Sequence, residues 1–142
     1  FIHLGNGSIV ELTKQHKPDC NEERELIEKK GGFVHTPRSR YGLTSGVARV
    51  QGRLAVSRAF GDTDVAKYLS VEPHVKVVDV TAHKGDKAVV MVVASDGLWD
   101  ALKPEQVFNA IIEEQKSCAN LTNLAVEKGS NDNVSCIMYK FF

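Results

Sequence analysis

An uninterrupted apolar run, Val89 to Ala94, constrains the fold more than any other feature of the chain. The run is rich in β-branched valine and far too short to span a membrane, so it predicts a strand buried on both faces. Asp96 follows directly after Ser95. A carboxylate at the end of a buried strand is costly unless a cation or hydrogen bonds compensate its charge.

Asp96 has two interpretations. An Asp-Gly pair after a strand is commonly an ordinary turn, because Asp caps its own backbone and Gly97 tolerates a sharp bend. The other interpretation is a metal site, since Asp100 brings a second carboxylate close by. A later segment, 129–135, places Asp132 at the start of a final strand. Carboxylates at strand ends, with no His or Cys beside them, suit a hard cation such as Mg²⁺ or Mn²⁺.

The charge balance gives no reason to expect nucleic acid or a membrane surface as a partner. The chain has 142 residues, enough for one domain with a core, and 18 basic residues face 18 acidic ones. A zero net charge gives no electrostatic reason to expect nucleic acid or an anionic membrane surface. No apolar stretch approaches the roughly 20 residues of a membrane helix. We therefore expect neither a nucleic-acid partner nor a membrane partner.

The three cysteines, Cys20, Cys118 and Cys136, are scattered and lack the CxxC spacing of a zinc site. We interpret them as free thiols in a reducing compartment. Since no signal-peptide pattern is present, a cytoplasmic or nuclear location is expected. The chain starts at Phe1 without a Met and in the middle of a predicted strand. It is expected to be a fragment or a processed piece.

The predicted elements favour an α+β fold, because strands are interleaved with only a few helices. A hairpin is expected around Gly5-Asn6-Gly7. Alternation over 71–80 predicts an edge strand, and segment 54–60 fits either a helix or a strand. If 54–60 is helical, Arg58 and Asp62 are spaced to form a structural ion pair. Helices are predicted at 21–30, at 104–112 and around 121–128, and a last strand at 134–140.

Five segments carry a family resemblance in the order in which the family has them. From about Val10 to Phe142 the chain resembles the metal-dependent protein phosphatases of the PP2C type. The segments are Leu12-Thr13-Lys14-Gln15-His16-Lys17-Pro18, Gly31-Gly32-Phe33-Val34, the stretch 49–62, Ala94-Ser95-Asp96-Gly97-Leu98-Trp99-Asp100, and Gly129-Ser130-Asn131-Asp132-Asn133-Val134-Ser135.

The resemblance implies a β-sandwich flanked by helices, with a two-metal centre between its sheets. It implies hydrolysis of phosphoserine and phosphothreonine on phosphoprotein substrates by a full-length protein that is a monomer. Metal ions would activate a bridging water while offsetting charge on the phosphoryl oxygens. Asp96 and Asp132 match the family's two metal-binding carboxylates in this half of the domain. Asp100 matches the position of a third, weaker metal.

The chain also departs from the family pattern. It lacks the family's N-terminal half, including an Asp-Gly-His-Gly-Gly segment, a further acidic residue and a phosphate-binding Arg. Residues 1–142 are therefore expected to be the C-terminal portion of a PP2C-like domain, catalytically silent alone. Two alternatives stay open: a pseudophosphatase or regulatory binding module, and a structural module whose acidic loops are only turns. The retention of Asp96 and Asp132 favours the enzyme, because buried carboxylates are costly without a metal.

Overall fold

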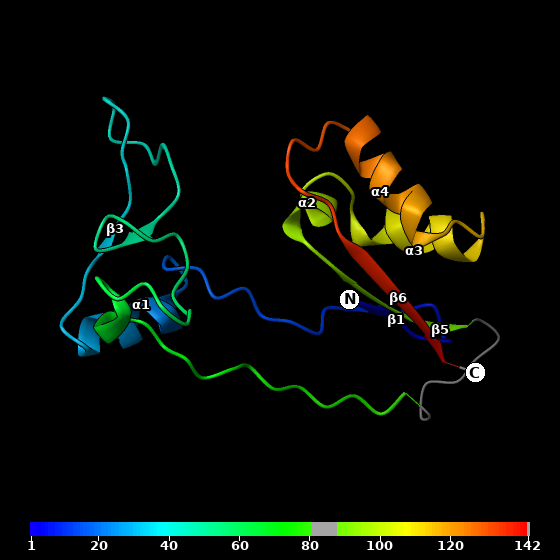
Figure 1. Cartoon of the computed structure of the whole chain (residues 1–142), viewed down its shortest axis with the longest axis horizontal. Helices are drawn as coiled ribbons and strands as arrows, with labels where there is room; N and C mark the ends of the chain where they lie inside the picture. The colour runs from blue at the N-terminus through cyan, green and yellow to red at the C-terminus, as the bar shows by residue number, and fades with distance from the viewer. Residues whose placement is uncertain (81–87, 142) are drawn as a thin grey trace. The chain divides into compact units, whose positions relative to one another are not determined.

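The computed structural model describes residues 1–80 and 88–141. The chain divides into two compact units, which are described separately. Phe1–Thr13 and Lys76–Phe142 form the first, here called the sheet unit. Lys14–Val75 form the second, the helix–ribbon unit. Figure 1 shows the two units and the helices and strands that each contains.

A four-stranded antiparallel sheet forms the centre of the sheet unit. The predicted apolar run is its longest inner strand, and the predicted hairpin pairs two short strands at its side. Gly7 closes the hairpin with a φ of 90°. The order is β2 (Ile9–Val10), β1 (Ile2–His3), β5 (Val89–Ala94) and β6 (Cys136–Phe141). Both the hairpin and the two long strands are confirmed.

Three helices follow β5: α2 (Asp96–Trp99), α3 (Pro104–Ile112) and α4 (Cys118–Glu127). Proline suits the first turn of α3, since its missing N–H would have no helical partner there. The backbone N–H of Lys103 donates to the side chain of Gln106 at 2.9 Å. Ser117 caps α4 by accepting from the N–H of Asn120 at 3.3 Å. The two longer helices are confirmed near their predicted positions.

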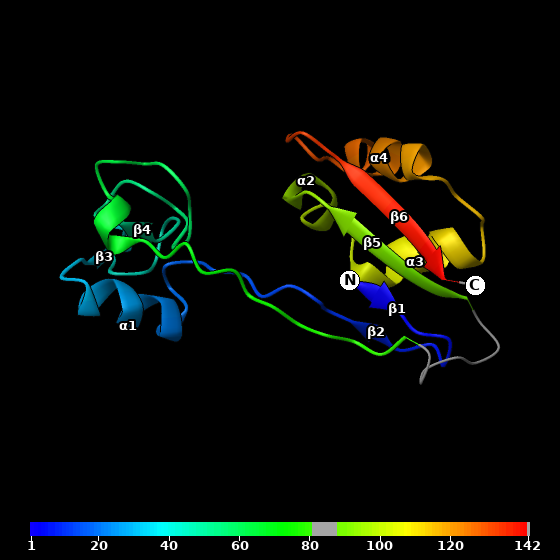
Figure 2. The same ribbon diagram turned by 60° about the horizontal axis from the view of Figure 1, so that its bottom comes forward.

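The helices α3 and α4 pack on one face of the sheet (Figure 1 and Figure 2). Their apolar side chains join inward-facing residues of β5 in one buried cluster: Val90, Val92, Leu98, Leu102, Val107, Phe108, Ala110, Ile111, Leu121 and Ala125. Burying such side chains stabilises the fold by roughly 25 cal/mol per Å² of apolar surface. The packing of this cluster against β5 and α2 holds the end of β5 in place, and Asp96 follows that end.

The opposite face of the sheet is only partly covered. Val93, Ile137 and Tyr139 are 55%, 69% and 57% exposed, and Val93 pairs with Ile137 across the two strands. The prediction that the apolar run is buried on both faces is therefore right for most of β5 and wrong at Val93. The α+β class with antiparallel sheets is confirmed.

Residues 71–80 do not form the predicted edge strand. None of them belongs to a strand, and Val77 is 91% exposed. A strand needs a neighbour to accept its backbone hydrogen bonds, and alternation in the sequence does not supply one. Instead Lys76 Nζ donates to the backbone carbonyl of Glu11 at 2.8 Å.

The helix–ribbon unit is built on α1 (Asn21–Lys29) and a two-stranded antiparallel ribbon, β3 (Val34–His35) with β4 (Arg49–Val50). Gly31 ends α1 in the left-handed region at φ 77°, as glycines at this position commonly do. A short 3₁₀ turn, η1 (Ala66–Tyr68), lies beside α1. The small core consists of Ile27, Val50, Val65 and Leu69.

A buried carboxylate ties this unit together. Glu23 of α1 is only 1% exposed, and Arg58 Nη2 donates to its Oε1 at 2.6 Å. Ser57 Oγ donates to Glu23 Oε2, and His16 Nδ1 lies against Oε1, both at 2.7 Å. Burial alone would raise the pKa of Glu23, but the hydrogen bonds from Arg58, Ser57 and His16 outweigh it and lower that pKa to about 2.

This cluster corrects the expectation for segment 54–60. The segment is neither a helix nor a strand, and Arg58 pairs with Glu23 instead of Asp62. Asp62 takes a φ of 46°, which belongs to a turn and not to a helix. Arg58 forms a structural ion pair, as expected, but its partner is Glu23 of the distant helix α1 and not Asp62.

Among the helices in the described ranges, none combines the length and the apolar character that a membrane crossing needs.

Candidate metal centre

Two loops meet where β5 ends and β6 begins. The first carries residues 95–100 and the second residues 129–135. Ser95 joins them, because its backbone N–H donates to the carbonyl of Ser135 at 3.1 Å. Ser95 Oγ donates to the carbonyl of Asn133 at 2.9 Å and accepts from the N–H of Ser135 at 3.0 Å. These bonds extend the pairing of Ala94 with Cys136 into the loops.

Gly97 allows the two loops to approach each other closely. A Cβ atom there would lie 2.5 Å from the backbone oxygen of Asn133, which no real side chain tolerates. Ser130 Oγ donates to the carbonyl of Gly97 at 2.7 Å. Gly97 does not have a positive φ, so a sharp turn does not explain why glycine is needed here. Glycine is needed because a side chain would collide with the other loop.

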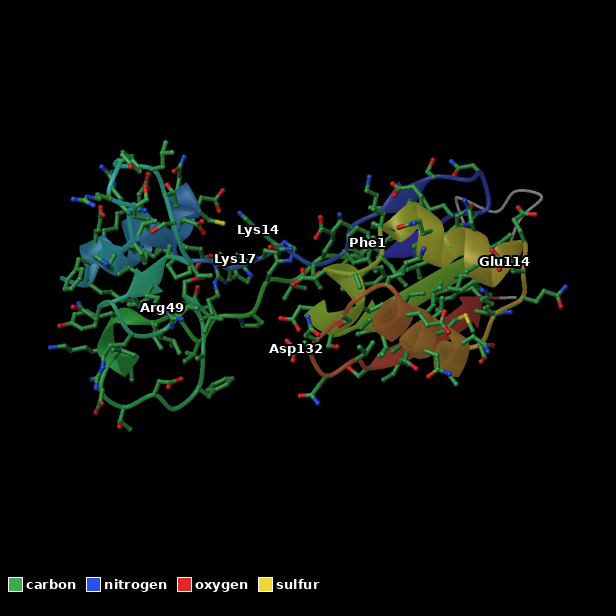
Figure 3. The ribbon with its side chains drawn as sticks, turned by 90° about the horizontal axis from the view of Figure 1, so that it is seen from above. Phe1, Lys14, Lys17, Arg49, Glu114 and Asp132 are labelled. Atoms are coloured by element: carbon green, nitrogen blue, oxygen red, sulfur yellow. The ribbon has the colours of Figure 1, made fainter. Side chains whose placement is uncertain are left out.

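Asp96 and Asp132 each accept a hydrogen bond from the backbone N–H of the residue that follows. Asp96 is the first residue of α2, and its Oδ1 accepts from the N–H of Gly97 at 3.1 Å. Asp132 Oδ1 accepts from the N–H of Asn133 at 2.7 Å. Both side chains are exposed, and Figure 3 shows Asp132 on the loop between α4 and β6. Each carboxylate therefore accepts a hydrogen bond within its own loop. Because both side chains are exposed, the expectation that these carboxylates are buried is wrong.

An open pocket lies between the loops, and Asp100 and Asp132 both line it. Asp96 does not line it but precedes Gly97, which does. Lys128 also lines this pocket and adds a positively charged side chain to it. The lining residues are Gly97, Asp100, Ala101, Lys128, Gly129, Ser130, Asn131 and Asp132. The structure thus brings all three predicted aspartates to one pair of loops.

The donor chemistry at these loops suits Mg²⁺ or Mn²⁺. The available ligands are carboxylate, carbonyl and hydroxyl oxygens, and the pocket is lined by no thiol or imidazole. Over residues 1–80 and 88–141, however, no three His, Cys, Asp or Glu side chains are grouped closely enough to hold a metal. The described residues therefore fit part of a hard-cation site and do not complete one.

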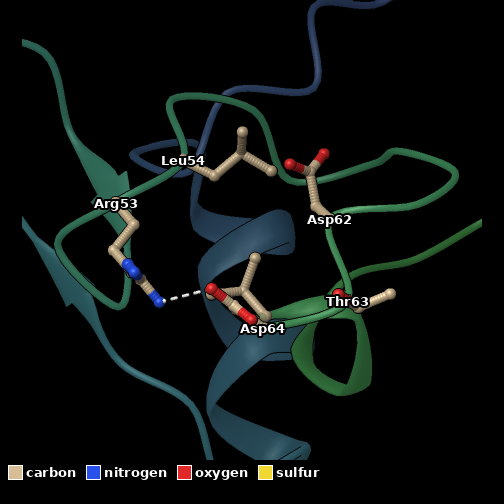
Figure 4. A pocket seen from close by; sticks show the side chains of 6 residues that line it. Arg53, Leu54, Asp62, Thr63 and Asp64 are labelled. Atoms are coloured by element: carbon tan, nitrogen blue, oxygen red, sulfur yellow. Dashed lines mark hydrogen bonds and ion pairs between the residues drawn. The ribbon is translucent and has the colours of Figure 1, made fainter.

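A second pocket lies in the helix–ribbon unit (Figure 4). Arg53 Nη1 donates to Asp64 Oδ2 at 2.9 Å across it, and Asp62 faces the same space. The side chains of the Arg53–Asp64 pair are 65% and 70% exposed. An ion pair this open to water contributes little to stability, typically below about 1 kcal/mol.

The sequence did not reveal the serines that join the two loops, nor the buried carboxylate of the other unit. Ser95 and Ser130 give no signal of their own, because a serine in a loop is ordinary until its partner loop is known. Glu23 likewise reads as a surface residue in the acidic first turn of a helix. A serine directly before Asp96 and another two residues before Asp132 were the only available hints.

Comparison with known proteins agrees with this arrangement of loops and sheet. Residues 1–134 match the family described as Protein phosphatase 2C. The chain therefore belongs to the protein phosphatase 2C family.

Two plant relatives illustrate the match. The chain is 35% identical over 138 residues to "Probable protein phosphatase 2C 71" of Arabidopsis thaliana, covering 95% of this chain and 28% of that protein. It is 39% identical over 139 residues to "Probable protein phosphatase 2C 62" of Oryza sativa subsp. japonica, covering 96% and 44%. The chain spans less than half the length of the curated relatives it matches.

A solved structure shows the same fold. The serine-threonine phosphatase 2C from Toxoplasma gondii superposes with a TM-score of 0.73 at 30% identity. That superposition covers 99% of this chain and 51% of the Toxoplasma chain. The predicted PP2C-like fold is confirmed.

Proposed function

We propose that this chain is the C-terminal portion of a PP2C catalytic domain that hydrolyses phosphoserine and phosphothreonine on protein substrates. The observation that carries the proposal is the pair of loops that carry Asp96 and Asp132, which the hydrogen bonds of Ser95 hold together. The whole domain needs more than this chain, since its relatives are more than twice as long.

In this proposal Asp96 and Asp132 hold Mg²⁺ or Mn²⁺, and Asp100 holds a further, weaker ion. A bound ion of this kind polarises phosphoryl oxygens and lowers the pKa of water. The chain's own part is to fix the carboxylates: the core under β5 and the Ser95 bonds hold both loops on rigid strands. The exposed oxygens of Asp96 and Asp132 leave open sides for water and a phosphate.

The test is a phosphatase assay on a chimera. The chain is joined to the part of the Toxoplasma phosphatase that it does not cover, and a phosphothreonine peptide is the substrate. We expect Mn²⁺-dependent release of phosphate. Because a neutral Asn binds a hard cation more weakly than Asp and the ion carries the catalysis in this proposal, Asp96→Asn and Asp132→Asn should each lower kcat/KM by at least about 100-fold. Asp100→Asn should lower it less.

Asp19→Asn is the matched control, because Asp19 is an exposed aspartate of the helix–ribbon unit. It should leave kcat/KM unchanged. Circular dichroism checks that every variant remains folded. A folded chimera whose activity is the same with and without the Asp96→Asn and Asp132→Asn changes would contradict the proposal. A folded, inactive chimera that still binds the phosphopeptide would instead favour a regulatory binding module.

A further inference from the structure

We propose that His16 and His74 of the helix–ribbon unit form a binding site for Zn²⁺, with water completing the coordination of the ion. The two imidazole rings lie together, with their centroids 6.1 Å apart. His16 stands near the start of this unit and His74 near its end. The site is separate from the candidate metal centre, whose three aspartates all belong to the sheet unit.

Glu23 orients the imidazole of His16 as a metal ligand requires. The Glu23 carboxylate is ionised at neutral pH, since its pKa is about 2, so it can only accept the hydrogen bond from His16 Nδ1 at 2.7 Å. In a neutral imidazole, Nε2 then carries the lone pair. Within residues 1–80 and 88–141, no group hydrogen-bonds to this nitrogen. A carboxylate behind one ring nitrogen and a free lone pair on the other are typical of zinc-binding histidines.

Two neighbouring residues, Ser57 and Arg58, bring the histidines to one place. Ser57 donates to the backbone carbonyl of His16 twice, through its N–H at 3.1 Å and through Oγ at 2.7 Å. Arg58 Nη1 donates to the backbone carbonyl of Glu72 at 2.7 Å. The segment that carries His74 is therefore held beside His16, although 58 positions separate the two histidines in the sequence.

The geometry and the donor atoms suit Zn²⁺. Two imidazoles on one tetrahedral zinc ion, with Zn–N bonds of about 2.1 Å, have ring centroids roughly 5–5.5 Å apart. A small rotation of the exposed His74 side chain would close the remaining difference from 6.1 Å. Imidazole nitrogen suits zinc, whereas Mg²⁺ and Mn²⁺ favour oxygen ligands. In the part of the chain that the structure describes, no three His, Cys, Asp or Glu side chains are grouped for a metal, so water supplies the other ligands.

A zinc ion at this site would join the two ends of the helix–ribbon unit. His16 and His74 come together only in the folded chain, so the ion binds the folded state in preference to the unfolded one. A ligand with this preference stabilises the fold. Zn²⁺ should therefore raise the midpoint of thermal unfolding, and His74→Gln should remove that increase.

The test is a calorimetric titration of the whole 142-residue chain with Zn²⁺, in a reducing buffer that contains excess Mg²⁺. We expect the wild-type chain to bind Zn²⁺ and to release it to EDTA. His74→Gln should weaken zinc binding at least about tenfold, because it removes a ligand. His35→Gln is the matched control and should leave binding unchanged, because His35 is another exposed histidine of the same unit. Circular dichroism checks that each variant is folded.

A second measurement needs no variant. Diethyl pyrocarbonate modifies imidazole nitrogens that are free, and mass spectrometry locates the modified histidines. Trypsin places His16, His74 and His35 on separate peptides, 15–24, 68–76 and 31–38. We expect Zn²⁺ to protect His16 and His74 from modification and to leave His35 as reactive as before.

Three results would overturn the proposal. The first is a wild-type chain that does not bind Zn²⁺. The second is a folded His74→Gln variant that binds zinc as tightly as the wild type, or zinc protection that is equal for His74 and His35. The third is loss of zinc binding in Cys20→Ser, which would place the ion at the thiol of Cys20 in the same unit.

Discussion

The residue with the most unusual setting is Glu23. It is a buried carboxylate that three side chains approach from outside its own helix: Arg58, Ser57 and His16. A buried charge costs several kcal/mol unless it is paired and hydrogen-bonded, and here both conditions are met. Loss of its charge should therefore leave Arg58 half-buried without its partner.

Glu23→Gln should destabilise the helix–ribbon unit by about 3–5 kcal/mol, the usual cost of breaking a buried ion pair from one side. Urea unfolding monitored by circular dichroism measures the loss. Glu22→Gln is the matched control, because Glu22 is the exposed neighbour in α1 and its carboxylate pairs with Lys14 at the surface. It should change stability little. Equal effects of the two substitutions would contradict the role given to Glu23.

Glu23 should also make stability depend on pH. Its pKa falls from 4.5 when the chain is unfolded to about 2 in the fold, so the folded state binds the proton less readily. The stabilisation is complete above about pH 4.5 and is lost as pH falls toward about 2, amounting to roughly 3 kcal/mol. Urea unfolding from pH 6 to pH 2 measures it. Glu23→Gln should remove most of this slope, and an unchanged slope would contradict the assignment.

Gly97 is the second residue whose substitution should be costly. Any side chain there meets the backbone oxygen of Asn133, so the two loops of the candidate centre must separate. Gly97→Ala should cost about 1–3 kcal/mol, as overpacking generally does. Ala101→Gly, in the same pocket, tests whether loop flexibility alone has such an effect. Thermal unfolding compares the variants, and a wild-type midpoint for Gly97→Ala would contradict the close approach.

At the scale of elements, the sheet unit depends on the helices packed against β5. Leu121 of α4 is fully buried and Val126 of the same helix is 59% exposed. Leu121→Ala should therefore cost about 2–5 kcal/mol, and Val126→Ala less than about 0.5 kcal/mol. Urea denaturation measures both. Similar losses at the two positions would show that α4 is not held by this face.

Most elements could be predicted from the sequence because their signals are local. The apolar run at 89–94, the turn glycines near Gly7 and Pro104 at a helix start each depend only on neighbouring residues. The strand expected at 71–80 failed because pairing depends on a distant neighbour that alternation does not reveal. The pairing of Arg58 failed for the same reason, since Glu23 is 35 positions away.

The candidate site, like the fold, could be predicted from local patterns but not in its long-range contacts. Asp96 stands two residues after β5, as the local pattern indicates, but the final strand begins at Cys136, four residues after Asp132. The structure places the loops of the two aspartates together. The contacts that join the loops could not be predicted, because the hydroxyl of Ser95 has a role only once β5 and β6 are paired. The steric need for Gly97 likewise depends on where Asn133 lies.

At the scale of the whole molecule, the partly covered face of the sheet has a measurable consequence. Val93, Ile137 and Tyr139 expose apolar surface side by side on β5 and β6. Such patches bind hydrophobic dyes and promote association. The chain should enhance the fluorescence of anilinonaphthalene sulfonate, and Ile137→Lys should reduce that enhancement. Val126→Lys on α4 is the matched control and should not. An equal reduction by both would contradict this assignment.

The central claim is that Asp96 and Asp132 are metal ligands in the completed domain, and a Mn²⁺ titration of the chimera with the Toxoplasma phosphatase tests it most directly. Electron paramagnetic resonance reports free Mn²⁺, whose signal weakens as the ion binds. We predict that the chimera removes Mn²⁺ from solution, that Asp96→Asn and Asp132→Asn each weaken this binding, and that Asp19→Asn leaves it unchanged. A double variant of the chimera at Asp96 and Asp132 that binds Mn²⁺ as well as the unmodified chimera would contradict the account.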